Sequence, residues 1–207
     1  ESYLIISFIE NNGIKPNKLR NDLLGAITSI HKIKSSKFGF GFDTQIGGLR
    51  QKNDKASNWV DFYREYRLQY IYELINSSNS MEKFINKKID LLLKKLENYI
   101  PKMPKPSLLH GDLWEGNILF NNSNFVGFID PGSFYGHNEL EIAYLRWFNP
   151  SFIQNSFIEK YNDIIKIDKE YKNYEPIYQL YYSLLNVYLW DRKYILDVKK
   201  LLDKIKI

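Results

Sequence analysis

Two short apolar segments separated by a polar turn constrain the fold of this chain most strongly. NILF (117–120) and FVGFID (125–130) have the length of β-strands, and the four residues between them, NNSN, favour a turn. An antiparallel hairpin is therefore predicted. Long stretches with apolar residues at helical spacing lie on both sides of it. We expect an α+β fold in which a mostly helical body carries one small hairpin.

Helical periodicity predicts most of the remaining elements. The prolines of PKMPKP (101–106) end one helix and lead into SLLH (107–110), a further apolar strand, whereas residues 37–53 are typical of a loop or hairpin. Two predicted helices follow possible caps: one after Asn17 has the apolar residues Leu23, Ala26, Ile27 and Ile30, and one after Ser57 has the stripe Trp59, Phe62, Tyr63, Tyr66 and Tyr70. A third helix runs from about Met81 to Tyr99, with an inward face of Phe84, Ile85, Ile89, Leu92, Leu93 and Leu96. A helical region begins at ELEIAYLRWF (139–148) and continues to the C-terminus.

Composition excludes several classes of protein. The 207 residues are 44% hydrophobic, which is enough for one core. Cysteine is absent, so disulfides and thiolate zinc sites are excluded, and a cytoplasmic location is expected. No apolar run approaches the length of a membrane span. The 29 Lys and Arg residues are scattered among 24 Asp and Glu residues, which predicts no nucleic-acid and no membrane partner and leaves the oligomeric state open.

Polar residues gather at the ends of the predicted hairpin. His110 and Asp112 precede it, Asn117 lies five positions after Asp112, and Asp130 lies eighteen positions after Asp112. The spacing matches phosphotransfer sites in which one aspartate accepts the hydroxyl proton while an asparagine and a second aspartate hold magnesium. Turn preference explains the residue types but not their spacing. We expect His110 to support the loop rather than to transfer protons.

Other catalytic chemistries have less support. Ser107 and Ser133 lack the G-x-S-x-G surroundings of a hydrolase nucleophile. Many carboxylates could form a glycosidase pair, but no feature of the sequence distinguishes one pair.

The motif LLHGDLWEGNILF followed by FIDPGSFYGHNELEIAYL resembles the fructosamine kinase (ketosamine kinase) family, within the wider group of aminoglycoside and choline phosphotransferases. The similarity extends through FGFGFDTQIGGLRQKNDKASNWVDFYREYRLQ upstream and YQLYYSLLNVYLWDRKYI downstream, nearly the whole chain. It implies the mostly helical C-terminal lobe of a protein-kinase-like fold. It also implies ATP- and Mg²⁺-dependent phosphorylation of a ketosamine, free or protein-bound. Phosphorylation at the third sugar carbon makes such an adduct unstable and regenerates the amine, so deglycation repair is implied.

The same resemblance assigns roles to individual residues. Asp112 would orient the attacking hydroxyl as base, and Asn117 and Asp130 would hold the magnesium ions that bridge the nucleotide phosphates. Trp114 would pack against the sugar, although ordinary packing explains an aromatic residue there equally well. Glu141 stands where the family commonly has aspartate, which predicts longer hydrogen bonds to the catalytic loop, and Glu115 stands where serine is common.

The start of the chain resembles the region between the two kinase lobes. Residues 1–10 would contain the last N-terminal-lobe strand (Leu4 to Ile6) and a hinge, where the backbone of Ser7, Phe8 and Ile9 would contact adenine. Residues 11–207 would form the helical lobe.

The resemblance places a glycine-rich loop, a phosphate-binding lysine and its glutamate partner before the hinge, and none of them occurs in this sequence. We therefore expect the β-rich N-terminal lobe to be largely absent from the chain, and the chain alone to be inactive. Two alternatives stay open: a phosphotransferase for another small alcohol such as an aminoglycoside or choline, or a non-catalytic binding module if that lobe is truly lacking.

Overall fold

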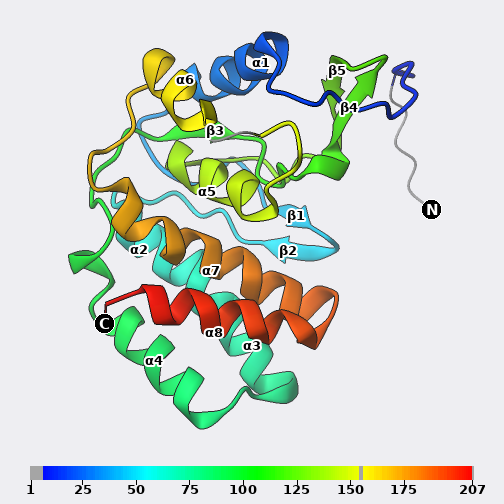
Figure 1. Ribbon diagram of the computed structural model, residues 1–207. Coiled ribbons are helices and arrows are strands. Elements are labelled where there is room, and N and C mark those ends of the chain that lie inside the picture. Colours follow the sequence, from blue (N-terminus) through cyan, green and yellow to red (C-terminus); the bar gives the residue numbers. More distant parts are fainter. Residues whose placement is uncertain (1–6, 154–155, 207) are drawn as a thin grey trace.

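The computed structural model of the chain describes residues 7–153 and 156–206. Helices α7 and α8 pack together in the lower half of the molecule, where α3 contacts α7 and α4 contacts α8 (Figure 1). Helix α5 lies on the other side of α7 and contacts β3, which in turn contacts α1. The predicted strand at Leu4 to Ile6 lies outside the described residues.

The described elements include eight α-helices and six short strands. The helices are α1 (Asn21–Lys32), α2 (Trp59–Tyr63), α3 (Gln69–Asn79), α4 (Lys83–Lys94), α5 (Asn138–Phe148), α6 (Ser156–Ile164), α7 (Tyr171–Leu189) and α8 (Ile195–Lys204), and the strands are β1 (Thr44–Ile46), β2 (Leu49–Gln51), β3 (Ser107–Leu109), β4 (Ile118–Asn121), β5 (Asn124–Phe128) and β6 (Phe134–Gly136). Within the described part of the chain, none of these helices has the length and hydrophobicity needed to cross a membrane.

The first two predicted helices exist, but their caps differ from the prediction. Helix α1 begins after Arg20, three residues beyond the start that a cap at Asn17 would give. Helix α2 is capped by Asn58 rather than Ser57, because the Asn58 side chain accepts hydrogen bonds from the backbone nitrogens of Val60 (2.8 Å) and Asp61 (3.4 Å).

A π-helical segment, Arg64–Leu68, joins α2 to α3. A π-turn contains more residues than an α-turn, so it rotates the following residues relative to the α-helical period. Trp59, Phe62 and Tyr63 are buried as the predicted stripe requires, but Tyr66 and Tyr70 are only partly buried, and Arg67 and Leu68 occupy the inner face.

Helix α4 is shorter than predicted. It ends at Lys94, and a 3₁₀ turn, Leu96–Asn98, replaces the last predicted helical residues. Ile85, Ile89 and Leu92 are buried as expected, whereas Phe84 is 50% exposed and does not belong to the core stripe.

The strands form three separate antiparallel pairs, β1–β2, β3–β6 and β4–β5. The predicted hairpin is confirmed as β4–β5, with Ile118 opposite Phe128 and with Asn122 and Ser123 in left-handed conformation (φ 48° and 64°), as a tight hairpin turn requires. Residues 37–53 contain the β1–β2 hairpin. The pairing of β3 with β6 was not predicted.

Arg67 joins the helical layer to the segment that follows β2. Its side chain is fully buried, and its guanidinium lies 4.8 Å from the ring centre of Phe62 and 4.0 Å from that of Phe134. It donates hydrogen bonds to the Lys52 carbonyl (2.9 Å) and to Oδ1 of Asn53 (2.6 Å). Aromatic faces and oriented oxygens thus offset the cost of burying this cation.

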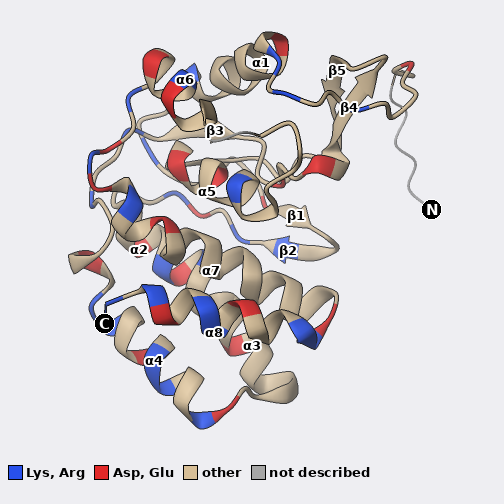
Figure 2. Ribbon diagram, in the orientation of Figure 1, with Lys and Arg blue, Asp and Glu red and all other residues tan. Residues whose placement is uncertain are grey.

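Positively and negatively charged residues are interspersed along the helices (Figure 2). Surface ion pairs of opposite charge include Lys88 with Asp203 and Lys199 with Glu82, both 2.8 Å apart. This arrangement agrees with the scattered charges seen in the sequence.

We predict that Arg67→Lys destabilises the protein by about 2–3 kcal/mol. The planar guanidinium lies against two aromatic rings and donates hydrogen bonds to both Lys52 and Asn53, and a lysine ammonium cannot make the same set of contacts. Chemical denaturation measures the change. Arg50→Lys is the matched control, since Arg50 is 75% exposed in its surface pair with Asp43, and we expect a change within about 0.5 kcal/mol. Equal effects of the two substitutions would contradict the role given to Arg67.

Candidate active site

Close contact between backbones shapes the loop that carries the predicted base. Gly111 has a φ of 88°, and a Cβ atom there would lie 2.1 Å from the Gly132 carbonyl oxygen. A Cβ on Gly132 would in turn lie 2.6 Å from the Gln45 carbonyl oxygen of β1. Only glycine fits at these positions. The backbones at Gly111, at Gly132 and in strand β1 are therefore in direct contact next to Asp112.

Glu141 of α5 holds this loop from inside the protein. Its carboxylate is 1% exposed and accepts hydrogen bonds from the backbone nitrogens of Gly111 (2.7 Å) and His110 (3.1 Å) and from Nε2 of His31 in α1 (2.8 Å). The bonds to the loop have ordinary lengths, so the predicted lengthening at this position is wrong. Burial alone would raise the pKa of Glu141, but the hydrogen bonds from His31 and Gly111 and the nearby imidazoles outweigh it and lower the pKa.

His110 has the supporting position expected of it. Its ring is buried, Nδ1 accepts a hydrogen bond from the Asp112 backbone nitrogen (3.3 Å), and the ring packs edge-on against Phe128. Because Nδ1 is an acceptor, the proton of a neutral imidazole is assigned to Nε2. Nε2 has no hydrogen-bond partner among the residues that the structure describes.

Asp112 and Asn117 are in direct contact. Asn117 is buried, and its Nδ2 donates to the Asp112 backbone carbonyl (2.9 Å) and to Oδ2 of the Asp112 side chain (3.2 Å). The Tyr144 hydroxyl donates to the other carboxylate oxygen, Oδ1 (3.2 Å). Burial raises the pKa of Asp112, and the hydrogen bonds from Tyr144 and Asn117 limit the rise.

The hairpin register places Asp130 beside Asn117. The Ile129 nitrogen donates to the Asn117 carbonyl (3.1 Å), immediately beyond the Ile118–Phe128 pair. Asp130 itself is exposed and has a left-handed backbone (φ 52°). Because Asn117 turns its amide nitrogen toward Asp112, its amide oxygen faces away from that carboxylate. One amide oxygen and one carboxylate are the hard donors that suit magnesium.

Other types of metal centre find no support in the described residues, where no group of three or more His, Cys, Asp and Glu side chains could hold an ion. The predicted set of Asn117 and Asp130 contains only one such side chain, so this finding does not bear on it.

The predicted hinge residues Ser7, Phe8 and Ile9 have no regular secondary structure, and Phe8 is 88% exposed. Ile9 lies against β5, because its Cδ1 atom is 3.0 Å from the position that a Cβ of Gly127 would occupy. The following residues are attached to β4, where the nitrogens of Asn12 and Gly13 donate to the Phe120 carbonyl (3.2 and 3.1 Å). The predicted hinge segment thus adjoins, through Ile9 and the residues that follow it, the hairpin flanked by Asn117 and Asp130.

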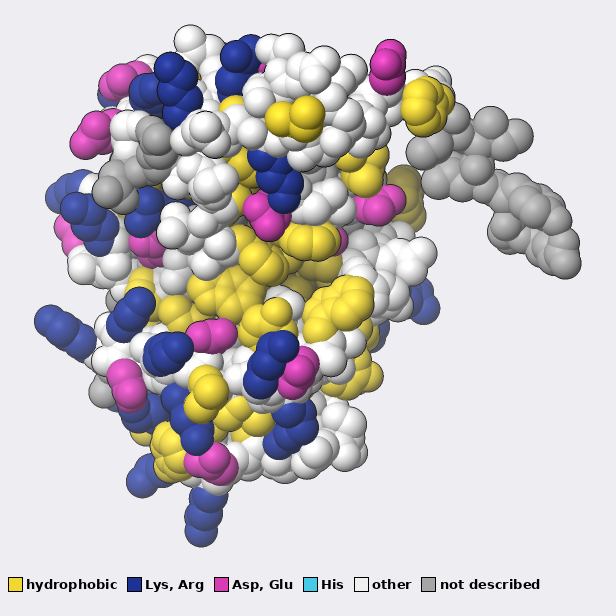
Figure 3. Space-filling model, turned by 45° about the vertical axis from the view of Figure 1, so that its right-hand side comes forward, with side chains coloured by type: hydrophobic (Ala, Val, Ile, Leu, Met, Phe, Trp, Pro, Cys, Tyr) yellow, Lys and Arg dark blue, Asp and Glu magenta, His cyan; other side chains and the backbone are white. Residues whose placement is uncertain are grey.

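A pocket of about 290 Å³ opens beside Asp112, and mostly apolar and aromatic side chains line it. Hydrophobic side chains gather across the middle of the face shown in Figure 3. Trp114 forms part of the lining, with its indole folded over Gly116, where a Cβ would lie 2.3 Å from the ring. Besides Trp114, the wall includes Tyr144, Phe148, Leu189, Trp190 and Tyr194.

These wall residues were missed as site residues. Tyr144 and Phe148 belong to α5, and the other three lie at the end of α7 or after it, so they meet around the pocket because α5 packs against α7. The sequence offers no signal for them, because the feature that distinguishes Trp190, the residue after α7, is its 71% exposure in the structure.

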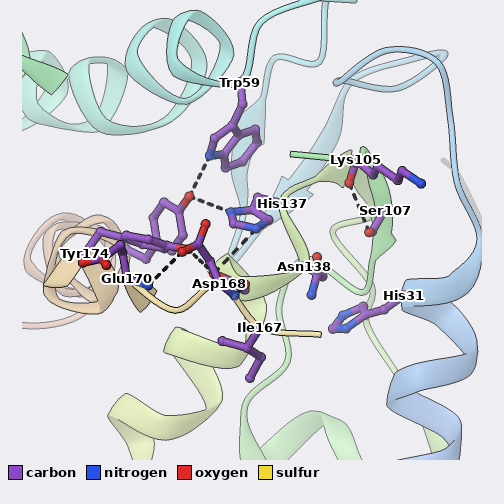
Figure 4. A network of polar contacts seen from close by, with 12 residues as sticks. His31, Trp59, Lys105, Ser107, His137, Asn138, Ile167, Asp168, Glu170 and Tyr174 are labelled. Atoms are coloured by element: carbon purple, nitrogen blue, oxygen red, sulfur yellow. Dashed lines mark hydrogen bonds and ion pairs between the residues drawn. The ribbon is translucent and has the colours of Figure 1, made fainter. Parts of the chain in front are cut away.

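A second polar network fixes the start of α5 (Figure 4). Nδ1 of His137 is 2.9 Å from the Tyr178 hydroxyl, which also accepts a hydrogen bond from Nε1 of Trp59 (2.8 Å). Tyr174 donates to the Glu139 carboxylate. Burial lowers the pKa of His137 to about 3, so this imidazole is neutral at physiological pH. The network anchors the helix that carries Glu141 and Tyr144.

Known proteins resemble the chain along its whole length. The model of the fructosamine kinase family matches residues 1–207. A protein of Enterococcus faecium named Probable ketoamine kinase is 34% identical over 208 residues, which cover 98% of this chain and 71% of the relative. A chloroplastic protein-ribulosamine 3-kinase of Arabidopsis thaliana is 30% identical over 204 residues, which cover 98% of this chain but 61% of the relative.

A solved structure shows the same architecture. The crystal structure of a Thermobifida fusca protein assigned as a fructosamine-3-kinase superposes with a TM-score of 0.85 at 23% identity, over 95% of this chain and 67% of that chain. The predicted protein-kinase-like fold, with helices and small sheets, is confirmed. The predicted absence of the N-terminal lobe is not confirmed, because the family model matches the chain throughout. The division at residue 10 stays a prediction.

We predict that Glu141→Gln lowers the free energy of unfolding by about 3 kcal/mol at pH 7, since an amide cannot accept all the hydrogen bonds of the carboxylate. The lowered pKa of Glu141 means that its contribution is complete above the ordinary value of 4.5 and is lost as the pH falls through the lowered value. The difference between parent and variant should therefore shrink below about pH 4.5.

Urea denaturation at several pH values measures this difference. Glu82→Gln is the control, because Glu82 is 55% exposed in its surface pair with Lys199. A loss in Glu141→Gln that did not change with pH would contradict the assignment.

Proposed function

Because the chain belongs to the fructosamine kinase family, we propose that it forms part of a kinase that transfers the γ-phosphoryl group of ATP to a sugar hydroxyl of a ketosamine. One observation supports this most directly. Asp112 lines the aromatic pocket and is hydrogen-bonded to Asn117, and the hairpin register places Asp130 beside Asn117. A base and two oxygen donors for a cation thus adjoin a space for an acceptor.

Asp112 would act on the acceptor. Its carboxylate would orient the attacking hydroxyl and accept its proton as the bond to phosphorus forms. Partial burial raises the pKa of Asp112, which makes the carboxylate a better proton acceptor than a fully solvated aspartate.

Asn117 and Asp130 would hold the magnesium ion, through the amide oxygen and the carboxylate. Bound there, the ion would supply positive charge to the nucleotide phosphates. The backbone of Ser7, Phe8 and Ile9 would contact the adenine, next to the hairpin against which Ile9 lies.

The aromatic pocket would receive the ketosamine. Sugars present apolar C–H faces that pack on aromatic rings, and Trp114 offers a ring whose position Gly116 permits. Two named relatives are kinases of ketoamines and of protein-bound ribulosamines, so free and protein-bound adducts are both candidate acceptors. Phosphorylation at the third sugar carbon would destabilise the adduct and regenerate the amine, a deglycation reaction in the cytoplasm.

Magnesium-dependent ATP consumption by the native full-length polypeptide tests this function. Acceptors are ribulosyl-lysine, fructosyl-lysine, an aminoglycoside and choline. We expect turnover with the ketosamines. Turnover with only the aminoglycoside or choline would show that the substrate is one of these alcohols and not a ketosamine. Nucleotide binding without any turnover would favour a binding module.

We predict that Asp112→Asn in the full-length polypeptide lowers kcat at least about a thousandfold, because the amide cannot accept the hydroxyl proton. The KM for ATP should change less than about twofold. Steady-state kinetics measure both values, and circular dichroism checks the fold. Asp203→Asn, at a 73% exposed side chain, should retain parental kinetics. Substantial turnover in Asp112→Asn would exclude Asp112 as the base.

We predict that Trp114→Ala raises the KM for the ketosamine about tenfold, with a smaller change in kcat, because the acceptor loses a stacking face. Gly116→Ala should have a similar effect, since its methyl group would displace the indole. Phe84→Ala, on the outer surface of α4, is the control. If Trp114→Ala kept the parental KM, Trp114 would be a packing residue only.

A further inference from the structure

We propose that Tyr144 is a positioning residue for Asp112, which holds the carboxylate in the orientation that accepts the substrate proton. The proposal rests on the proposed function, since it presupposes Asp112 as the base. It assigns a role to a residue of α5 that lies within a quoted motif but received no role from it.

Two donors from different parts of the fold hold the Asp112 carboxylate. Tyr144 donates to Oδ1 (3.2 Å) from α5, and Asn117 donates to Oδ2 (3.2 Å) from the 3₁₀ turn Glu115–Asn117. A carboxylate with one donor can still rotate about its Cβ–Cγ bond. With a donor on each oxygen, its plane is fixed. Each oxygen retains a lone pair, so the acceptor hydroxyl can still reach the base.

The position of the Tyr144 hydroxyl is determined by the packing of its ring. Tyr144 is 5% exposed, and its ring stacks face to face on Tyr182 of α7, with centroids 3.6 Å apart and planes at 10°. Phe148 packs edge-on against the same ring (5.2 Å, 70°). The packing of α5 on α7 therefore determines where the Tyr144 oxygen lies.

Chemistry determines which group donates the hydrogen bond between Tyr144 and Asp112. An ionised carboxylate only accepts, so the tyrosine hydroxyl is the donor. Burial and the charge of Asp112 raise the pKa of Tyr144 well above the ordinary value, which keeps it protonated. Tyr144 also lines the pocket together with Asp112, so the hydrogen bond lies where an acceptor would bind.

Tyr182 offers a matched control for simple packing. Its side chain is 1% exposed, and its hydroxyl has no hydrogen-bond partner among the residues described. Tyr144→Phe and Tyr182→Phe each remove one buried hydroxyl from the same stacked pair of rings and leave both rings in place. Only the first removes a contact with the base.

The experiment compares these two variants in the full-length polypeptide, with kcat and both KM values measured for a ketosamine and ATP. We expect Tyr144→Phe to lower kcat about tenfold with both KM values within twofold, and Tyr182→Phe to match the parent. Parental kcat in Tyr144→Phe would overturn the proposal. So would a raised KM at unchanged kcat, which would make Tyr144 a substrate contact, or an equal loss in both variants, which would indicate packing.

A structural readout separates this proposal from the proposed function. A crystal structure of Tyr144→Phe should show the Asp112 carboxylate rotated about its Cβ–Cγ bond, and an unchanged orientation would overturn the proposal whether or not ketosamines are substrates. An active parent, an inactive Asp112→Asn and a fully active Tyr144→Phe would refute only the role of Tyr144. A parent without ketosamine turnover would refute only the proposed function.

Discussion

The site depends on the hydrogen bonds that the buried carboxylate of Glu141 accepts. This carboxylate accepts two backbone hydrogen bonds from residues 110–111 and one from His31, so a single side chain connects this loop with α5 and α1. A carboxylate with 1% exposure is stable only when donors surround it. Any movement of α5 would thus break hydrogen bonds that the interior cannot replace with water. The position of Asp112, one residue beyond Gly111, follows from this constraint.

Two glycines hold the same loop in place through close backbone contacts. Gly111 and Gly132 allow the loop, the turn before β6 and strand β1 to approach more closely than side chains permit. The β1–β2 hairpin is fastened to that stack, because Gln51 and Thr44 donate to the Gly132 carbonyl (3.2 and 3.3 Å). One edge of the aromatic pocket, formed by Ile46 and Gly47, is consequently held next to Asp112.

Sequence reasoning predicted the parts of this molecule that local chemistry determines. The β4–β5 hairpin follows from turn residues between apolar segments, and the contact between Asp112 and Asn117 follows from their spacing. It failed where distant segments meet. The β3–β6 pair joins residues far apart in the chain. The π-helical turn at Arg64–Leu68 changes the helical period, and no single residue in the sequence indicates that turn. Tyr144 lies in the predicted helical region that begins at residue 139, and the sequence does not show that α7 places Tyr182 behind its ring.

The surroundings of Asp112 balance two opposing effects on its basicity. The apolar wall of the pocket removes water and raises the pKa of Asp112, while hydrogen bonds from Tyr144 and Asn117 favour the ionised form. Without those donors, the same burial would favour a protonated carboxyl, which cannot accept a proton. Without the wall, the carboxylate would be fully solvated and a weaker base. Because one donor comes from α5 and the other from the turn before β4, helix packing and hairpin register together determine how basic Asp112 is.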